Sequence, residues 1–174
     1  MDGTAYYYDN NGNLTNDGTY KYYYDCDHVI VEYENGTLKR KFIYGPGIDG
    51  PIVMIDVTDS DKYYYYHFDG LGSVVALSDE NADIVEKYTY DVFGECTVHG
   101  PAPDGNWGTG DDITDCNSLY DNPYLFTSRR LDPETGLYYY RARMYNARIE
   151  LESEQGKGST FRIILPVEKG GDAT

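Results

Sequence analysis

The sequence has few cysteines, few basic residues and no long apolar run. Its three cysteines, Cys26, Cys96 and Cys116, are too sparse for a disulfide-stapled fold and leave the cellular compartment open. No stretch approaches the roughly 18 consecutive apolar residues of a membrane span. The first residues lack the basic and apolar regions of a signal peptide. We therefore expect no membrane span and no signal peptide in this chain.

The charge balance is strongly acidic. There are 14 lysines and arginines against 30 aspartates and glutamates, which gives a formal net charge of -16. A polyanion is repelled by a phosphate backbone and by an anionic membrane surface. We therefore expect no nucleic acid among the partners.

What the sequence has in abundance is tyrosine, with 21 residues, in segments separated by turn-forming residues. Tyrosine favours half-buried strands, and Asn35-Gly36 between two strand-like runs is a strong hairpin signal. Residues 78–88 fit a short helix or a strand, and their β-branched and aromatic ending favours the strand. Residues 100–118 form a long acidic loop. We predict an all-β fold of sequential antiparallel hairpins, forming a twisted and partly open sheet.

Tyrosine followed by aspartate recurs at four places. The pairs are Tyr8-Asp9, Tyr24-Asp25, Tyr90-Asp91 and Tyr120-Asp121. An aspartate side chain can accept a hydrogen bond from the backbone two residues on and so start a turn. Each pair therefore predicts a strand that ends in tyrosine and turns through aspartate.

Three ordered stretches carry a family resemblance. "YYYDNNGNLTNDGTYKYYYD" resembles the YD repeats of the Rhs family, and "YYYYHFDGLGSVVALSDENADIVEKYTYDVFGE" resembles the stretch before the Rhs-associated core. "NPYLFTSRRLDPETGLYYYRARMY" is similar to the core motif itself, and the whole resemblance covers roughly residues 1–145. The matching core-motif positions are Asn122, Pro123, Tyr124, Asp132, Pro133, Gly136, Tyr139, Arg141 and Arg143.

The resemblance implies a spiralling β-sheet that rolls into a hollow shell. In large members the shell encloses a C-terminal toxin, and other members act in recognition at cell surfaces. It therefore implies a secreted or cell-surface location and the rest of an Rhs shell as a partner. The chain is too short to close such a shell. After Tyr145 the family's self-cleaving protease region is replaced by "NARIELESE", so we carry over no catalytic residue.

The composition changes near Asn146. Residues 1–147 carry a net charge of -15 and all the tyrosines, whereas residues 148–174 carry -1 and none. "RIELESEQGKGSTFRIILP" resembles the last hairpin of the ATP-binding domain of sensor histidine kinases, where Gly156, Gly158 and Thr160 occupy the positions that border the nucleotide. No helix follows the glycines to orient a phosphate, so we interpret the stretch as a hairpin that extends the tyrosine-rich sheet. We predict two parts, residues 1–145 and 146–174.

Two further patterns have both a functional and a structural interpretation. The oxygen-rich loop that holds Asp104, Asn106, Asp111 and Asp112 offers calcium ligands, but its spacing is not that of an EF-hand, which favours a solvated loop pinned by Trp107. In "KYYYYHF", Tyr64 and Tyr66 face one way and Tyr63 and Tyr65 the other. One pair is then core, and the other lines a surface suited to a glycan or a protein.

These patterns contain no arrangement of residues for nucleophilic catalysis. We interpret the chain as a non-catalytic Rhs-core fragment, a structural β-scaffold without a cofactor and with a surface for glycan or protein binding. Two alternatives stay open. One is the remnant of an ATP-binding histidine kinase, and the other is a truncated or rearranged product without an independent function.

Overall fold

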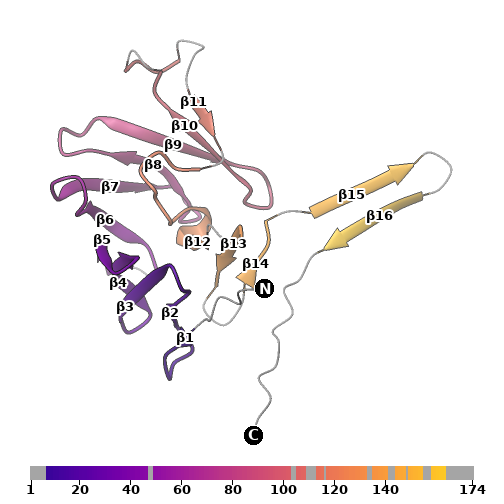
Figure 1. Cartoon of the computed structure of the whole chain (residues 1–174). Helices are drawn as coiled ribbons and strands as arrows, with labels where there is room; N and C mark the ends of the chain where they lie inside the picture. Colours follow the sequence, from indigo (N-terminus) through magenta and orange to yellow (C-terminus); the bar gives the residue numbers. More distant parts are fainter. Residues whose placement is uncertain are drawn as a thin grey trace, which may run out of the picture.

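The computed structural model describes residues 7–46, 49–102, 105–108, 113–115, 117–132, 135–140, 144–147, 149–154 and 158–163. The fold is all-β, as predicted, and is built on an eleven-stranded antiparallel sheet whose strands follow one another in chain order (Figure 1). In the described part of the chain β1 and β11 form its two edges, so the sheet is open. The strands are β1 (Tyr7–Tyr8), β2 (Leu14–Asn16), β3 (Tyr20–Asp25), β4 (His28–Glu34), β5 (Thr37–Tyr44), β6 (Pro51–Asp56), β7 (Lys62–Phe68), β8 (Val74–Ser78), β9 (Ile84–Tyr90), β10 (Cys96–Gly100) and β11 (Ile113–Asp115).

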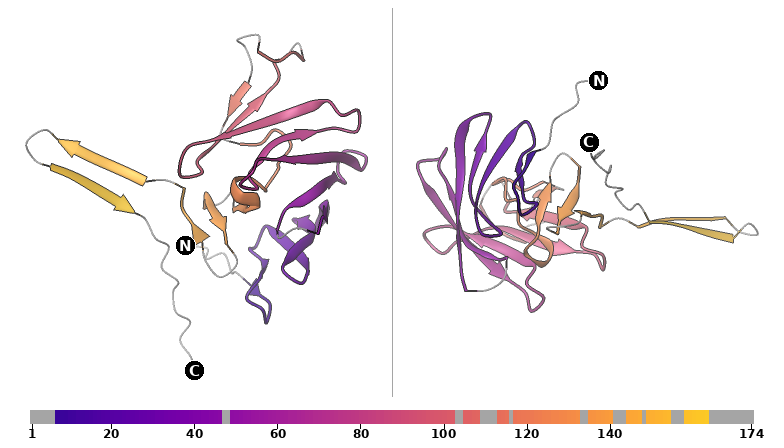
Figure 2. Two further views of the ribbon diagram at one scale, coloured as in Figure 1. Left: turned by 180° about the vertical axis from the view of Figure 1, so that it is seen from behind. Right: turned by 90° about the horizontal axis from the view of Figure 1, so that it is seen from below.

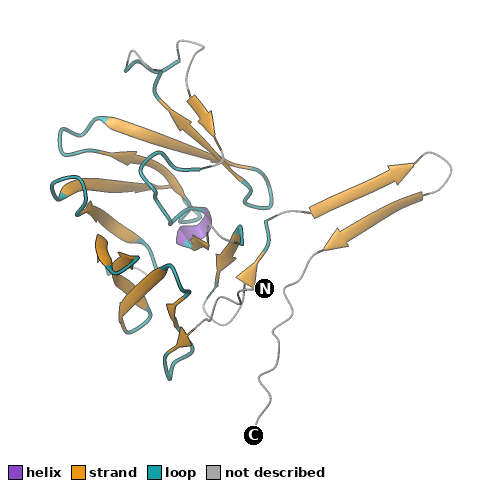
Figure 3. Ribbon diagram, in the orientation of Figure 1, coloured by secondary structure: helices purple, strands orange, loops and turns teal. Residues whose placement is uncertain are grey.

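Two smaller sheets follow. β12 (Arg130–Asp132), β13 (Leu137–Tyr139) and β14 (Met144–Tyr145) form a three-stranded sheet, and β15 (Ile149–Glu154) pairs with β16 (Gly158–Ile163). The last hairpin forms where expected, but it makes its own two-stranded sheet instead of extending the large one. Figure 3 shows one short helical turn, η1 (Phe126–Ser128), among the strands. In the described part of the chain, no helix has the length and apolarity to cross a membrane.

Four hairpin turns share one hydrogen-bonding pattern. In each, an aspartate carboxylate accepts the backbone N–H groups two and four residues later; these residues are Asp9, Asp69, Asp79 and Asp91. The residue three after the aspartate has a positive φ and is glycine in every turn but one, where it is Ala82. The predicted turns after Tyr8 and Tyr90 are therefore confirmed. The prediction at Tyr120 is wrong, because no strand of the described residues ends there and the chain turns before Asp121, whose N–H donates to the Ser118 carbonyl oxygen. At Tyr24, strand β3 continues through Asp25.

Side chains alternate between the two faces of the sheet. Tyr64 and Tyr66 are 3% and 7% exposed and face the core, whereas Tyr65 is 40% exposed on the other face, as the strand period predicts. Residues 84–90 form strand β9, which confirms the choice of strand over helix. Asn35 and Gly36 both have positive φ between β4 and β5, as the hairpin signal requires.

The predicted loop at residues 100–118 is only partly a loop. Ile113–Asp115 pairs with β10 as strand β11, because β-branched Ile113 and Thr114 continue the ladder opposite Gly100 and His99. Trp107 itself is held on the sheet, as expected. Its indole N–H donates to the carbonyl oxygen of Ile84 at 3.2 Å, and the ammonium of Lys87 lies over its ring.

The core lies on the concave face of the curved sheet. Figure 2 shows the segment that leads into β12–β14 lying within this curve. Buried side chains from the sheet, among them Met54, Val74 and Leu77, pack there with Tyr124 and Leu125 of that segment. We call residues 117–132 the strap, because they cross the concave face of the sheet.

Gly94, in the turn between β9 and β10, is a sensitive point of strap packing. It has φ +98°, and an added Cβ would lie 2.5 Å from the Phe126 ring. Gly94→Ala should therefore lower the free energy of unfolding by more than about 2 kcal/mol, from backbone strain and overpacking together. Gly12→Ala has a similar φ and open space around it, so it should cost only about 1 kcal/mol. Urea unfolding would show this difference, and equal losses would contradict it.

Candidate functional site on the concave face

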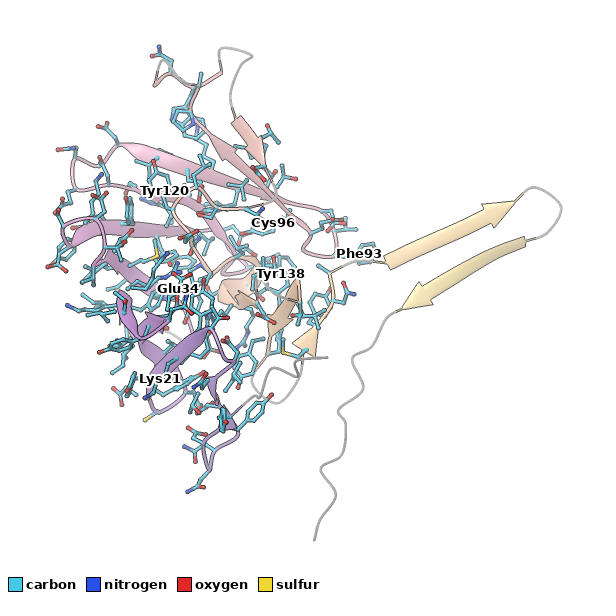
Figure 4. All side chains as sticks on the ribbon, in the orientation of Figure 1. Lys21, Glu34, Phe93, Cys96, Tyr120 and Tyr138 are labelled. Carbon is cyan, nitrogen blue, oxygen red and sulfur yellow. The ribbon has the colours of Figure 1, made fainter. Side chains whose placement is uncertain are left out.

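The family-motif residues Asn122, Pro123 and Tyr124 lie in the strap and are buried against the sheet. Figure 4 marks this region by the labelled side chains of Tyr120 in the strap, Cys96 on β10 and Tyr138 on β13. The strap is a candidate site because it brings buried carboxylates and guanidinium groups together in one place.

The start of the strap is anchored on Glu86 of β9, whose side chain is fully buried. Its carboxylate accepts hydrogen bonds from the hydroxyl of Ser118 and the backbone N–H of Leu119, each at 2.6 Å, and from the hydroxyl of Tyr88. Burial raises the pKa of Glu86 above its usual value, and these three donors oppose the rise. The hydrogen bonds make Glu86 a structural anchor for the strap.

The side-chain amide of Asn122 makes all four of its hydrogen bonds within the protein. Its Oδ1 accepts from the hydroxyl of Tyr66 at 2.8 Å and from the N–H of Tyr124 at 3.0 Å. Its Nδ2 donates to the hydroxyl of Tyr88 at 3.0 Å and to the carbonyl oxygen of Tyr124 at 2.9 Å. A buried amide with all four hydrogen bonds made fixes the position of the strap over β7 and β9.

The middle of the strap packs through Tyr124. Its ring meets Phe42 edge-on at 5.1 Å between centroids, and its hydroxyl lies 2.7 Å from that of Tyr44. Burial raises the pKa of Tyr124 to about 12, so the hydroxyl stays protonated. Thr127 and Ser128 then turn with positive φ, and the N–H of Thr127 donates to the hydroxyl of Ser73.

The end of the strap is held by buried ion pairs. Glu32, on β4 and fully buried, lies between two arginines. Arg130 of β12 donates to its Oε2 at 2.8 Å, and Arg40 of β5 approaches its Oε1 at 2.8 Å. Arg130 also lies over the ring of Tyr22 at 3.9 Å. Burial alone would lower the pKa of Arg130, but the Glu32 carboxylate keeps it above the usual value. The preceding Arg129 donates to Asp49 at 2.6 Å.

Two cavities of similar volume adjoin the strap, besides a much smaller one. One has a volume of about 270 Å³ and includes Arg40, Arg130, Ser118, Asn122 and Cys96 in its wall. Burial raises the pKa of the Cys96 thiol to about 12, which leaves it protonated and unsuited to nucleophilic attack at neutral pH. The other, of about 290 Å³, is lined mostly by aromatic and aliphatic side chains between β3 and β13.

The other predicted motif and site residues lie apart from this centre. Asp132 and Gly136 shape the turn from β12 to β13, where the Gly136 N–H donates to the Asp132 carbonyl oxygen at 2.8 Å, and Tyr139 is half-buried on β13. Asn106 lies in a turn beside Trp107. Gly158 and Thr160 lie within strand β16. Outside the described residues are Asp104, Asp111, Asp112, Pro133, Arg141, Arg143 and Gly156.

Metal binding gains no support from the geometry. Within the ranges that the structure describes, no group of three or more His, Cys, Asp or Glu side chains could hold a metal ion. The three histidines are apart: His28 lies 3.8 Å from Asp49, His67 pairs with Ser78, and His99 pairs with Thr89. The calcium interpretation of the acidic loop stays a prediction.

Four residues of this site were not predicted from the sequence: Glu32, Glu86, Arg40 and Arg130. A signal was available for the two glutamates. In "HVIVEYE" the strand period places Glu32 on the same face as the buried Tyr22, which lies opposite it on β3. In "IVEKYTY" it places Glu86 on the same face as the buried Tyr88, two residues later. A carboxylate at a core-facing position needs a partner, and the arginines that follow "FTS" are natural partners.

The Glu32 cluster should dominate the stability of the strap. Glu32→Gln leaves two buried guanidinium groups without their carboxylate, so it should lower the free energy of unfolding by about 3–5 kcal/mol. Glu34→Gln is the matched control on the same strand. Glu34 pairs with Lys39 and is partly exposed, so its loss should cost less than about 1 kcal/mol. Chemical denaturation measures both, and similar small effects would contradict the assignment.

We expect Glu86 to make the free energy of unfolding depend on pH. Its pKa is raised in the folded state above the ordinary value of 4.5, so the folded protein binds a proton more tightly than the unfolded chain. The stability of the wild type relative to Glu86→Gln should therefore rise as pH falls through the raised folded pKa, and level off below about 4.5. Urea unfolding at several pH values would show this trend. A difference that stays constant across this range would contradict it.

Three curated proteins with similar sequences are named as nucleases. No family model matches the sequence. A tRNA3(Ser)-specific nuclease WapA from Bacillus spizizenii is 31% identical over 141 residues, which is 79% of this chain and 5% of that protein. A tRNA(Glu)-specific nuclease WapA from Bacillus subtilis subsp. natto is 31% identical, and a tRNA nuclease WapA from Bacillus subtilis strain 168 is 30% identical, each over 151 residues, 83% of this chain and 6% of the relative.

These relatives correct the interpretation of the sequence. The chain is similar to proteins that are named as nucleases, which overturns its assignment as a non-catalytic scaffold and as a non-enzyme. They also replace the family assignment that combined an Rhs core with a histidine-kinase hairpin, because no relative reported above is a kinase. They lend no support to carbohydrate binding or a cell-surface role. The chain spans only 5–6% of the length of the curated relatives it matches.

Proposed function

We propose that this chain is a portion of a toxin-related nuclease that acts on tRNA. The observation that carries the proposal is the similarity, over 79–83% of the chain, to three proteins that are all named as tRNA nucleases. The aligned length is far longer than one turn or hairpin, so a shared motif alone does not account for it.

Charge argues against the acidic sheet as the surface that holds tRNA. The chain carries a net charge of -16, and RNA binding depends on the neutralisation of phosphates by lysine and arginine. Arg40, Arg129 and Arg130 are engaged with buried or half-buried carboxylates of the sheet. We assign the tRNA contact to a more cationic part of the nuclease, so the predicted absence of nucleic-acid binding by this sheet stays part of the proposal.

The sheet offers the rest of the nuclease a packing surface on its convex face. Ile43, Val53 and Tyr65 are aligned by strand register across β5, β6 and β7; Ile43 and Tyr65 are 45% and 40% exposed, whereas Val53 between them is only 9% exposed. An apolar row of this kind suits a protein partner. We also propose that residues 1–145 and 146–174 are separate parts, which agrees with the independent pairing of β15 and β16.

The proposal predicts that the protein that carries this chain cleaves tRNA. Incubation of the purified protein with total tRNA, followed by denaturing electrophoresis, should give discrete fragments while ribosomal RNA stays intact. Intact tRNA at stoichiometric protein would contradict the proposed function.

A separate measurement tests the charge assignment. The 174-residue chain should bind fluorescent tRNA no better than an unrelated acidic protein of similar size at physiological salt. Tight binding by the chain alone would place the tRNA contact in it and overturn that assignment, while leaving the proposed activity in place.

A further inference from the structure

We propose that the convex face of the large sheet docks an acidic protein surface that lies elsewhere in the same longer protein. The proposal rests on three features of the described residues: no carboxylate in the middle of this face, lysines without ion pairs, and exposed tyrosine and isoleucine side chains between them. It also rests on the proposal that this chain is a portion of a longer protein, but not on the activity of that protein.

Strand register defines the middle of the convex face, on the side of the sheet turned away from the strap (Figure 2). Three lines of paired residues cross the strands there, through Tyr63, Tyr65 and His67 of β7, which alternate with the core-facing Tyr64 and Tyr66. We call these lines the convex patch: Tyr23, Val31, Lys41, Ile55 and Tyr63; Ile43, Val53, Tyr65, Ser78 and Ile84; His67, Ala76, Lys87, His99 and Thr114. No member of the convex patch is acidic.

This absence of carboxylates contrasts with the composition of the chain, which has 30 acidic and 14 basic residues. In strands β3 to β10, Glu32, Glu34, Asp56 and Glu86 are in register with residues of the concave face, and Asp25 ends β3 beside its turn. The acidic charge of these strands therefore lies on the concave face and at strand ends.

The basic residues of the convex face have no counter-charge in the described part of the chain. Lys41 and Lys87 belong to the convex patch, and Lys21 of β3 lies on the same face. None of these three lysines forms an ion pair there, whereas Lys39 and Lys62 each pair with carboxylates. A surface that brings carboxylates to the convex face would therefore meet complementary charge.

Between the lysines, the convex patch is aromatic and aliphatic. Tyr23, Ile43 and Tyr65 are 46%, 45% and 40% exposed. Tyrosine is enriched at protein interfaces, since its ring buries apolar area and its hydroxyl finds a hydrogen bond. RNA binding depends instead on cations that neutralise several phosphates, and the net charge of -16 opposes it. The convex patch therefore favours a protein over RNA.

We assign the partner to the rest of the same polypeptide. Each relative described above is matched over only 5–6% of its length, so most of such a protein lies outside the matched segment. Parts of one chain meet at a high effective concentration. That concentration offsets the long-range repulsion between an acidic partner and a chain of net charge -16. A second copy of this face would instead place lysines against lysines.

The test is zero-length cross-linking of the purified longer protein that carries this chain. A carbodiimide activates Asp and Glu carboxylates, and a lysine amine in contact with one then forms an amide. In the monomer band, mass spectrometry should find Lys21, Lys41 or Lys87 joined to carboxylates outside the 174 residues. Lys39 and Lys62 should join carboxylates within the chain, because their ion pairs are 2.9 Å and 3.2 Å long.

Lys41→Arg is the matched variant. It keeps the positive charge but removes the reactive amine, so any cross-link assigned to Lys41 should disappear while those of Lys87 stay. The proposal is overturned if the three convex lysines form no cross-links, or join carboxylates only within the 174 residues. It is also overturned if they react only in a dimer band, which indicates a second copy, or only after ribonuclease treatment, which indicates RNA.

The cross-links report contact and not cleavage. Intact tRNA in a preparation that gives the expected cross-links would contradict the proposed nuclease activity and leave the docking surface in place. Cleaved tRNA without the cross-links would overturn the docking surface alone.

Discussion

The burial of the Glu32 carboxylate is the constraint on which the rest of the concave face depends. A charged group on a core-facing position of β4 is tolerable only if cations meet it there. Arg40 comes from the neighbouring strand, but Arg130 comes from the strap, 98 residues later in the sequence. The ion cluster therefore links a contact between adjacent strands to a segment that is distant in the sequence. Without the strap, the sheet would leave Glu32 and its surrounding tyrosines open to water.

The strap satisfies a second buried carboxylate in the same way. Glu86 is a second buried carboxylate on a strand, and it is again satisfied by strap atoms, here the Ser118 hydroxyl and a backbone N–H. Asn122 connects the tyrosines of two strands, and Tyr124 fills the space between the two polar anchors. A sheet made only of neighbouring hairpins has few contacts between distant strands. The strap supplies them, and its polar anchors set its register where apolar packing alone would allow it to slide.

The sequence predicted the sheet well and the site poorly, for physical reasons. Hairpins are local, because the turn after Asp91 and the turn at Asn35-Gly36 are determined by residues that are neighbours in the sequence. The order and pairing of the strands can therefore be predicted from the amino-acid sequence. The burial of Tyr64 and Tyr66 follows from strand alternation. The ion pair between Glu32 and Arg130 is not local, since it depends on how the sheet curves and on where the strap crosses its concave face. Ile113–Asp115 was missed as a strand because two β-branched residues are few against an acidic, glycine-rich background. The interpretation as a scaffold is overturned by relatives that are named as nucleases, and each alignment covers only 5–6% of such a relative.

We expect the strap and the sheet to unfold as one cooperative unit held by buried charge. Native-state hydrogen exchange tests this most directly, because it reports the opening free energy of individual amides. The N–H groups of Leu125, Thr127 and Leu131, which bond to Arg129, Ser73 and Pro123, should exchange with the free energy of global unfolding, as the amides of β8 do. Exchange of these three amides by a separate, much easier opening, with β8 still protected, would contradict the account.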